Sequence, residues 1–419
     1  MTSLEKMNFF DPETVECPFA FYAAARAEAP VYRLPSSPIP GRDVWLVTPY
    51  RLVHEVLRDW KRFSNKFASL MSARGQRDPE VEAIMAEGFP QVETMLTQDP
   101  PAQREYRTLV NKAFSAARVN SMEAYIKQIC DELIDGMAKS TECDFFESFA
   151  IPLPVYVIAD QLGVPRADLR QFKRWSDDVI ASLSQMGGRE AQLQGARSTV
   201  EMHQYFARVV ESRRAEPRDD IISDVANATV YDGRLLTMSE ALSIIQQLLV
   251  AGNETTTNAL AGGMGYILET PGLAGQIGAD PALIPNIVEE VLRLEAPTKH
   301  MWRIVTQDTE LGGVNLPEGA ILLLSYDAAN RDESKYADGD AFCPHRENAD
   351  THLSFGLGTH FCVGALLARK EMNIAYERLF TRLADLRLTP GKNEMRHISS
   401  ILHRGLTGLH VSYGVRESK

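Results

Sequence analysis

The sequence is poor in several features that would place it in a familiar class. Its 419 residues include five cysteines, which are scattered and form no C-x-x-C pair. This odd, dispersed set argues against a disulfide framework, a zinc ribbon and an iron–sulfur cluster. There is no uncharged apolar run of about 18 residues, and the stretch 1–11 is charged rather than apolar. We therefore expect no signal peptide, no membrane anchor and a cytoplasmic location.

Positive charge, internal repeats and low-complexity linkers are also scarce. The net charge of −12 at pH 7 makes nucleic acid an unfavourable partner. With 44% hydrophobic residues the chain can bury a large core, and no repeat or linker divides it. No G-x-G-x-x-G unit joins a strand to a helix, so a dinucleotide or flavin site is not indicated. We expect one domain over residues 1–419, mainly α with a smaller β region (α+β), and a monomer.

Helical periodicity dominates the first 300 residues. The predicted helices cover about 18–29, 49–58, 101–114, 118–138, 154–162, 167–184 and 197–214. Strands are predicted at 43–48 and within 301–326, where short apolar runs alternate with glycine and proline turns. The stretch 327–361 shows neither pattern, and irregular stretches of this length are usually functional.

The longest predicted helix begins after Thr237, which forms a capping box with Glu240, and ends before Pro271. It spans 32 residues, or about 48 Å at 1.5 Å per residue. It is apolar nearly all round, as a helix through the middle of a large core would be. Its centre, 251–258, contains glycine and three threonines, which disfavour a straight helix. Residues of low helix propensity in the middle of a buried helix indicate either a functional site or a kink whose polar groups are hydrogen-bonded.

A glycine-rich loop surrounds one of the five cysteines. Residues 354–364 read SFGLGTHFCVG, and a helical pattern follows over 365–380. Glycines 356, 358 and 364 would allow positive φ values and close backbone approach. The N-terminus of the following helix is expected to lower the pKa of the Cys362 thiol. These features favour a metal-bound thiolate over a merely structural cysteine.

This loop resembles the haem-ligand loop of the cytochrome P-450 family of haem-thiolate monooxygenases, and specifically the soluble bacterial type. The matching positions are Phe355, Gly356, His360, Cys362 and Gly364. The resemblance implies that Cys362 is the axial ligand of haem b, because a cysteine thiolate holds the iron in that family. It also implies the cytochrome P-450 fold, with haem between the long central helix and the cysteine loop.

The centre of the long helix resembles the family's oxygen-activation motif. Ala251 and Gly252 correspond to the small residues that leave room for dioxygen above the haem. Glu254 and Thr255 correspond to the acid and the alcohol that deliver protons, and are the candidate catalytic residues. A carboxyl group and a hydroxyl linked by water suit such a relay.

Two further motifs resemble structural and haem-binding parts of the family. Glu290 and Arg293 match its Glu-x-x-Arg helix, and Arg346 is placed to complete a buried triad, with Cys343 where relatives often carry aspartate. Haem propionates need cationic or N–H donors. The residues that match propionate-binding positions are Gln103, where relatives have histidine, together with Arg107, Arg303 and His360.

The resemblance implies a monooxygenase that inserts one oxygen atom from dioxygen into a small-to-medium apolar organic substrate, by hydroxylation or oxidative dealkylation. Electrons would come from NAD(P)H through a separate reductase and a ferredoxin of the two-iron type, because this chain shows no reductase unit. A peroxide-using or non-oxygenating haem-thiolate enzyme and a haem-based sensor or carrier are the alternatives. Both are disfavoured by the Glu254–Thr255 pair, which they do not need.

Two expectations concern surfaces rather than the haem. The ferredoxin should dock on the cysteine side, on Lys112, Arg118, Arg369 and Lys370. The substrate pocket should be lined by about 64–98, 178–200, 244–252, 297–302 and 399–404. Lys299 or His300 would anchor a carboxylate or carbonyl of the substrate if either pointed inward. Otherwise Lys299 reaches solvent and His300 binds a propionate or the backbone.

Overall fold

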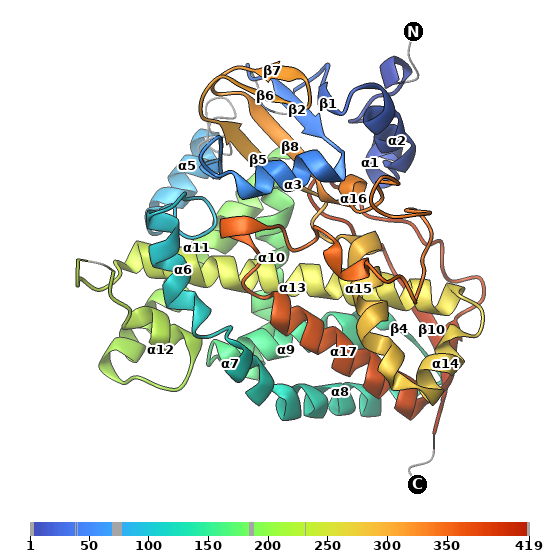
Figure 1. The fold of residues 1–419 in the computed structure, drawn as a ribbon. Coiled ribbons are helices and arrows are strands. Elements are labelled where there is room, and N and C mark those ends of the chain that lie inside the picture. The colour runs from blue at the N-terminus through green and yellow to red at the C-terminus, as the bar shows by residue number, and fades with distance from the viewer. Residues whose placement is uncertain are drawn as a thin grey trace.

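A 32-residue helix, α13 (Met238–Glu269), runs through the middle of the structure (Figure 1). The computed structural model describes residues 4–37, 39, 41–68, 78–183, 188–230 and 232–416. The predicted capping box is confirmed: the Thr237 hydroxyl accepts from the Glu240 amide, and the Glu240 carboxylate accepts from the Thr237 amide at 2.8 Å. The helix stays continuous through 251–258, so the polar centre does not break it.

Helices α9, α10, α11 and α15 pack directly against α13, whereas α1, α2 and α3 lie apart from it near the N-terminus (Figure 1). The bounds of these and the remaining helices are α1 Pro12–Glu16, α2 Phe19–Glu28, α3 Tyr50–Arg58, α5 Pro79–Ala86, α6 Ala102–Asn111, α7 Ala116–Ser121, α8 Glu123–Met137, α9 Pro152–Gln161, α10 Leu169–Leu183, α11 Gly188–Ala215, α12 Ile221–Ala226, α14 Leu273–Ala279, α15 Ile284–Glu295, α16 Tyr326–Ala329 and α17 Ala365–Arg382. The seven predicted helices are confirmed, except that 118–138 is divided into α7 and α8 at Met122. Helix α11 starts earlier than predicted, at Gly188.

A five-stranded sheet lies at the N-terminal side of the molecule, in the order β1-β2-β8-β5-β3 (Figure 1). Its strands are β1 Val31–Arg33, β2 Val44–Val47, β3 Phe63–Ser64, β5 His300–Val305 and β8 Ile321–Ser325. All five residues of β8 are buried, because this strand lies between β2 and β5 and both its faces are covered. The predicted strands at 43–48 and 301–326 are confirmed, including the hairpin of β6 Thr309–Leu311 and β7 Val314–Leu316.

A smaller sheet, in the order β4-β10-β9, joins Glu142–Asp144, His410–Val415 and Leu383–Leu388. The sequence patterns did not indicate these strands or β1 and β3. All are short or carry polar residues, and their partners are distant in sequence. The fold is mainly helical with small sheets, as predicted.

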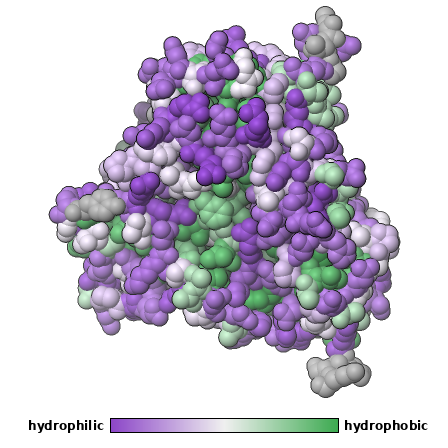
Figure 2. Space-filling model, in the orientation of Figure 1, coloured by the Kyte–Doolittle hydropathy of each residue, from purple (hydrophilic) through white to green (hydrophobic). Residues whose placement is uncertain are grey.

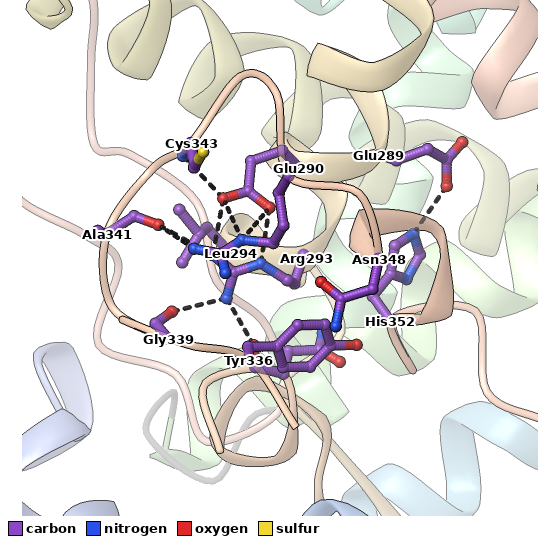
Figure 3. A network of polar contacts seen from close by, with 12 residues as sticks. Glu289, Glu290, Arg293, Leu294, Tyr336, Gly339, Ala341, Cys343, Asn348 and His352 are labelled. Atoms are coloured by element: carbon purple, nitrogen blue, oxygen red, sulfur yellow. Dashed lines mark hydrogen bonds and ion pairs between the residues drawn. The ribbon is translucent and has the colours of Figure 1, made fainter. Parts of the chain in front are cut away.

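A network of buried charges ties α15 to the irregular stretch before the cysteine loop (Figure 3). Arg293 donates to both oxygens of the Glu290 carboxylate at 2.7 and 2.8 Å, and Arg346 donates to the same carboxylate at 3.0 and 3.1 Å. Arg293 also donates to the carbonyls of Asn330 and Gly339 and stacks over the Tyr336 ring. The predicted triad is confirmed. The bond from position 343 comes from the backbone amide, at 2.9 Å from Glu290, so cysteine serves there as well as aspartate.

We predict that Arg346→Met destabilises the fold by about 3–5 kcal/mol, because it leaves the Glu290 charge only half compensated in the interior. It also removes donors from the carbonyls of Ala337, Asp338 and Ala341. The measurement is the free energy of unfolding from urea titration. Arg33→Met is the matched control, because its partner Asp43 and Arg33 itself are exposed, and it should change stability by less than about 1 kcal/mol. Equal effects of the two variants would contradict a supporting role for the network.

Candidate functional site

The loop that carries Cys362 is closed by its own backbone. The Cys362 amide donates to the Phe355 carbonyl at 2.9 Å, and the Gly356 amide donates to the Leu353 carbonyl at 2.8 Å. Gly356 and Gly358 have φ values of 65° and 72°, as predicted. A Cβ on Gly358 would lie 2.6 Å from the Leu57 carbonyl oxygen, so this glycine also permits close packing against α3. These constraints fix the position of the cysteine.

The prediction for Gly364 is wrong: its φ is −85°, because it is the N-cap residue of α17 rather than a turn residue. Its amide instead acts as a donor toward the sulfur. The amides of Gly364 and Ala365, together with Arg107 and Arg369, lower the pKa of the Cys362 thiol. Burial is the larger effect, and the pKa is raised overall. The expected lowering by the helix end is therefore present but outweighed by desolvation.

Three cationic or N–H donor side chains converge near this loop from separate elements: Arg107 from α6, Arg303 from β5 and His360 from the loop itself. Arg303 is 3% exposed, and burial lowers its pKa. Burial, followed by Arg303 and Arg107, lowers the pKa of His360 to about 3. The Nε2 atom of His360 is buried without a hydrogen-bond partner. Among the described residues, neither Arg107 nor Arg303 forms an ion pair with a carboxylate.

Gln103 is placed differently from the prediction. Its amide nitrogen donates to the Thr359 carbonyl at 2.8 Å, so it holds the cysteine loop against α6. Asn65, which the sequence did not single out, contacts His360 Nδ1 at 3.3 Å. Tyr326 was also missed, although its hydroxyl interacts with Arg303. Neither residue lies in a motif, and only the folded backbone brings them to the site.

The middle of α13 provides a second wall. Ala251 is exposed, although the helix around it is largely buried. A Cβ on Gly252 would meet only Ile158, at 4.0 Å, so protein packing does not require glycine there. The Thr255 hydroxyl donates to the Ala251 carbonyl at 2.8 Å and is therefore held on the same side of the helix. Thus two small residues and one hydroxyl share a surface that protein atoms do not cover.

Glu254 is a weak acid in this structure. Burial, and then the nearby Asp177, raise its pKa to about 7, while Lys173 and Asn258 act in the opposite direction. Asp177 and Lys173 form an ion pair with each other on α10. A carboxyl group with a pKa near neutrality can both hold and release a proton at physiological pH. These two α10 residues were not predicted.

Lys299 and His300 do not point into a cavity. The Lys299 ammonium donates to the carbonyls of Val15 and Ser400 at 2.7 and 2.9 Å. The ring nitrogens of His300 contact the Ile401 carbonyl and the Tyr22 hydroxyl. The anchor hypothesis is therefore wrong, and so is the expectation that Lys299 reaches solvent. The prediction of a backbone partner for His300 is confirmed.

These residues fit haem. Amide donors stabilise a sulfur ligand, and the buried Arg303 and half-buried Arg107, which form no ion pair with a carboxylate among the described residues, suit propionates. The orphaned nitrogen of His360 gives a further donor in the same place. Small residues in the middle of α13, Ala251 and Gly252, leave open space that would suit a flat macrocycle. None of the helices within the described ranges combines the length and apolar character that a bilayer crossing requires.

Comparisons with known proteins agree with this arrangement. The family model for cytochrome P-450 matches residues 282–398. The chain is 35% identical to cytochrome P-450 107B1 of Saccharopolyspora erythraea, over 94% of each protein. It is 36% identical to the steroid C26-monooxygenase of Mycobacterium tuberculosis, over 88% of this chain and 87% of that one.

Among solved structures, that of CYP109E1 from Bacillus megaterium in complex with testosterone aligns with a TM-score of 0.82 and 33% identity, over 96% of this chain and 99% of that one. The two proteins are therefore similar both in sequence and in fold over most of their length. Several relatives of this chain are named monooxygenases, and the family uses haem b. The chain is a monooxygenase of the cytochrome P-450 family.

Proposed function

We propose that this monooxygenase holds its haem through Cys362 and oxidises a medium-sized apolar substrate. Two observations carry the proposal: the cysteine lined by the amides of Gly364 and Ala365, and the surface of α13 at Ala251 and Thr255 that protein atoms do not cover. A relative named as a steroid C26-monooxygenase and a structural neighbour solved with testosterone support a substrate of that size. A substrate library screened for the low-to-high-spin shift of the Soret band would identify it.

When bound, haem supplies the chemistry that activates dioxygen. The residues of the chain hold it in place: Cys362 would bind the iron, while Arg107, Arg303 and His360 would bind the propionates, whose charge compensates the buried cations. Phe355, Gly356 and Gly364 shape the cysteine loop, and Gln103 braces it. Ala251 and Gly252 would leave room for the macrocycle.

Glu254 and Thr255 would supply protons. Glu254 takes a proton from solvent on the α10 side, where Asp177 is half-exposed, and its pKa of about 7 allows it to release that proton again. The Thr255 hydroxyl, oriented by the Ala251 carbonyl, passes it toward the reacting oxygen. The same pair disfavours the non-oxygenating, peroxide-using and sensor alternatives, which require no such relay.

We predict that Cys362→Ser abolishes the red-shifted Soret band of the reduced carbonyl complex, because only a thiolate ligand produces it. Cys343→Ser is the control and should keep the band, since only the backbone amide of position 343 contacts Glu290. The measurement is the difference spectrum after reduction under carbon monoxide. A band retained in Cys362→Ser would overturn the assignment of the ligand.

We predict that Thr255→Ala binds haem and substrate normally but diverts electrons to free hydrogen peroxide. Product formed per NAD(P)H consumed should fall by about tenfold or more, since a positioned proton donor contributes about 10²–10⁴-fold to a rate. Thr257→Ala is the matched control, because that hydroxyl donates to the Ala150 carbonyl on another side of the helix. Unchanged coupling in Thr255→Ala would leave Thr255 a packing residue.

The pH dependence follows from the same carboxyl group. Because the pKa of Glu254 is raised to about 7, the protonated acid is present below that pH and is lost above it. Coupling in the wild type should therefore fall as pH rises through about 7, and Glu254→Gln should be poorly coupled at every pH. A wild-type profile without an inflection in this range would contradict the relay.

We propose a ferredoxin, supplied with electrons by an NAD(P)H-dependent reductase, as the redox partner. The expected docking cations need revision, because all four already have acid partners. Arg369 forms a bidentate ion pair with Glu289 and Lys370 bonds to Glu123. Lys112 and Arg118 pair with Asp224 and Asp219.

Other residues around the cysteine loop are more available to a partner. Arg104, next to the loop-bracing Gln103, and Arg58, next to Gly358, are both exposed. Phe361 and Leu366, on either side of the ligand, are 39% and 50% exposed. Figure 2 shows apolar surface near the middle of this face, within a largely hydrophilic surround. The proposed surface therefore has an apolar centre with arginines at its edge.

We predict that Arg104→Glu and Leu366→Ser each slow transfer of the first electron from the ferredoxin by about tenfold. Salt should weaken the effect of the first variant but not of the second, because only the first acts through charge. The measurement is stopped-flow reduction under carbon monoxide. Arg387→Glu, the same charge change on an exposed residue of β9, should reduce normally. Rates equal to the wild type in both variants would place docking elsewhere.

A further inference from the structure

The N-terminal segment braces a loop that is almost 400 residues away in sequence. Lys299 is 2% exposed and joins three parts of the chain. Its ammonium donates to the Val15 carbonyl, in α1, and to the Ser400 carbonyl in the C-terminal loop. Glu16, next in α1, forms a bidentate ion pair with Arg396 at the start of the same loop. The N-terminal segment is thus bonded to the loop 396–406 at two points.

The same loop pairs with the chain around Lys299 through the backbone. The Lys299 amide donates to the Leu402 carbonyl at 2.8 Å, and the Arg404 amide donates to the Pro297 carbonyl at 2.9 Å. Thr298 lies opposite His403 in an isolated antiparallel bridge. Lys299 therefore holds this short ladder from its side chain as well as from its backbone.

The ladder lies beside the proposed proton relay. Gly405, which follows it, packs against the Asn258 side chain so closely that a Cβ would not fit. Asn258 is one helical turn after Glu254 and contributes to the pKa of that carboxyl. A displacement of loop 399–404 would therefore alter the wall next to Glu254 and Thr255.

Burying a lysine ammonium group is energetically unfavourable. Its presence here indicates that its N–H donors have a role that an apolar side chain could not fill. Burial lowers the pKa of Lys299 to about 8, with Asp327 acting in the opposite direction. Methionine would fill a similar volume without a charge, but it would leave the Val15 and Ser400 carbonyls without the ammonium donor. If Lys299 only filled space, a well-packed apolar side chain could replace it without loss of stability.

We propose that Lys299 is a positioning residue for substrate: it fixes loop 399–404 against the start of β5 and so sets the shape of the pocket wall beside Glu254. This inference rests on the proposed function, because the wall matters only if haem and substrate bind between it and the cysteine loop. Lys299 itself does not touch the substrate.

The test uses two iron-binding probes of different size on the haem-loaded enzyme. Imidazole reaches the iron with little contact to the walls, whereas 4-phenylimidazole must also fit against them. In Lys299→Met the affinity for imidazole should stay within about twofold, while that for 4-phenylimidazole should fall by about tenfold, the size expected for loss of a charge-assisted hydrogen bond. Both are read from the shift of the Soret band.

Arg26→Met is the matched control, because Arg26 also bonds the N-terminal segment to a buried carbonyl, that of Ala328, away from the loop. It should lower stability and leave both probe affinities unchanged. Lys299→Arg, which keeps charged donors, should restore most of the 4-phenylimidazole affinity. If Lys299→Met does not fold, Lys299→Gln, which keeps N–H donors without charge, takes its place in the same titration.

The outcomes separate the two claims. A normal thiolate Soret band with lowered 4-phenylimidazole affinity supports the positioning role. A normal band with both affinities unchanged overturns it and leaves Lys299 a purely structural residue. Absence of the thiolate band in the wild type itself would instead overturn the proposed function.

Discussion

One buried carboxylate, that of Glu290, fixes the segment before the cysteine loop against helix α15 and so positions the candidate site. It is fully buried and neutralised by two arginines from different parts of the chain. Those arginines bind five backbone carbonyls of the stretch 330–341, which has little regular structure to satisfy them. An irregular segment can be buried only when its polar backbone groups find partners, and here charged side chains supply them.

A short chain of hydrogen bonds connects the Glu290 network to the cysteine loop. Asn330 accepts from the Leu353 amide at 2.7 Å and donates to the Ser354 hydroxyl at 2.8 Å. Ser354 in turn donates to the Leu292 carbonyl of α15 at 2.6 Å. The cysteine loop is therefore hydrogen-bonded to α15, the same helix that carries Glu290. Removing the ion pairs would loosen the ligand loop without touching the ligand.

The sequence predicted the features that depend on local pattern. The capping box at Thr237 and the long central helix follow from residue pattern and spacing. The Glu290–Arg293–Arg346 triad follows from the resemblance to the family, and the structure shows all three features. What it could not predict depends on distant partners or on competing energies. Pairing of 142–144 with 410–412 leaves no local signal. The net direction of the Cys362 pKa depends on burial outweighing the amide donors, which no motif encodes. Lys299 is polar in sequence but buried in structure, because its partners lie nearly 300 residues before it and 100 after it.

Because β2 pairs with β8, which is far later in the sequence, β2 is synthesised long before its partner strand is available. Val44 pairs with Ile321, so at about 5–20 residues per second β2 leaves the ribosome roughly 14–55 s before its partner exists. In that interval β2, all four residues of which are buried in the finished fold, has only the short strand β1 beside it. A two-stranded ribbon of this size is not stable alone. We therefore expect β1 and β2 to remain unpaired, or to be protected, until most of the chain has been made.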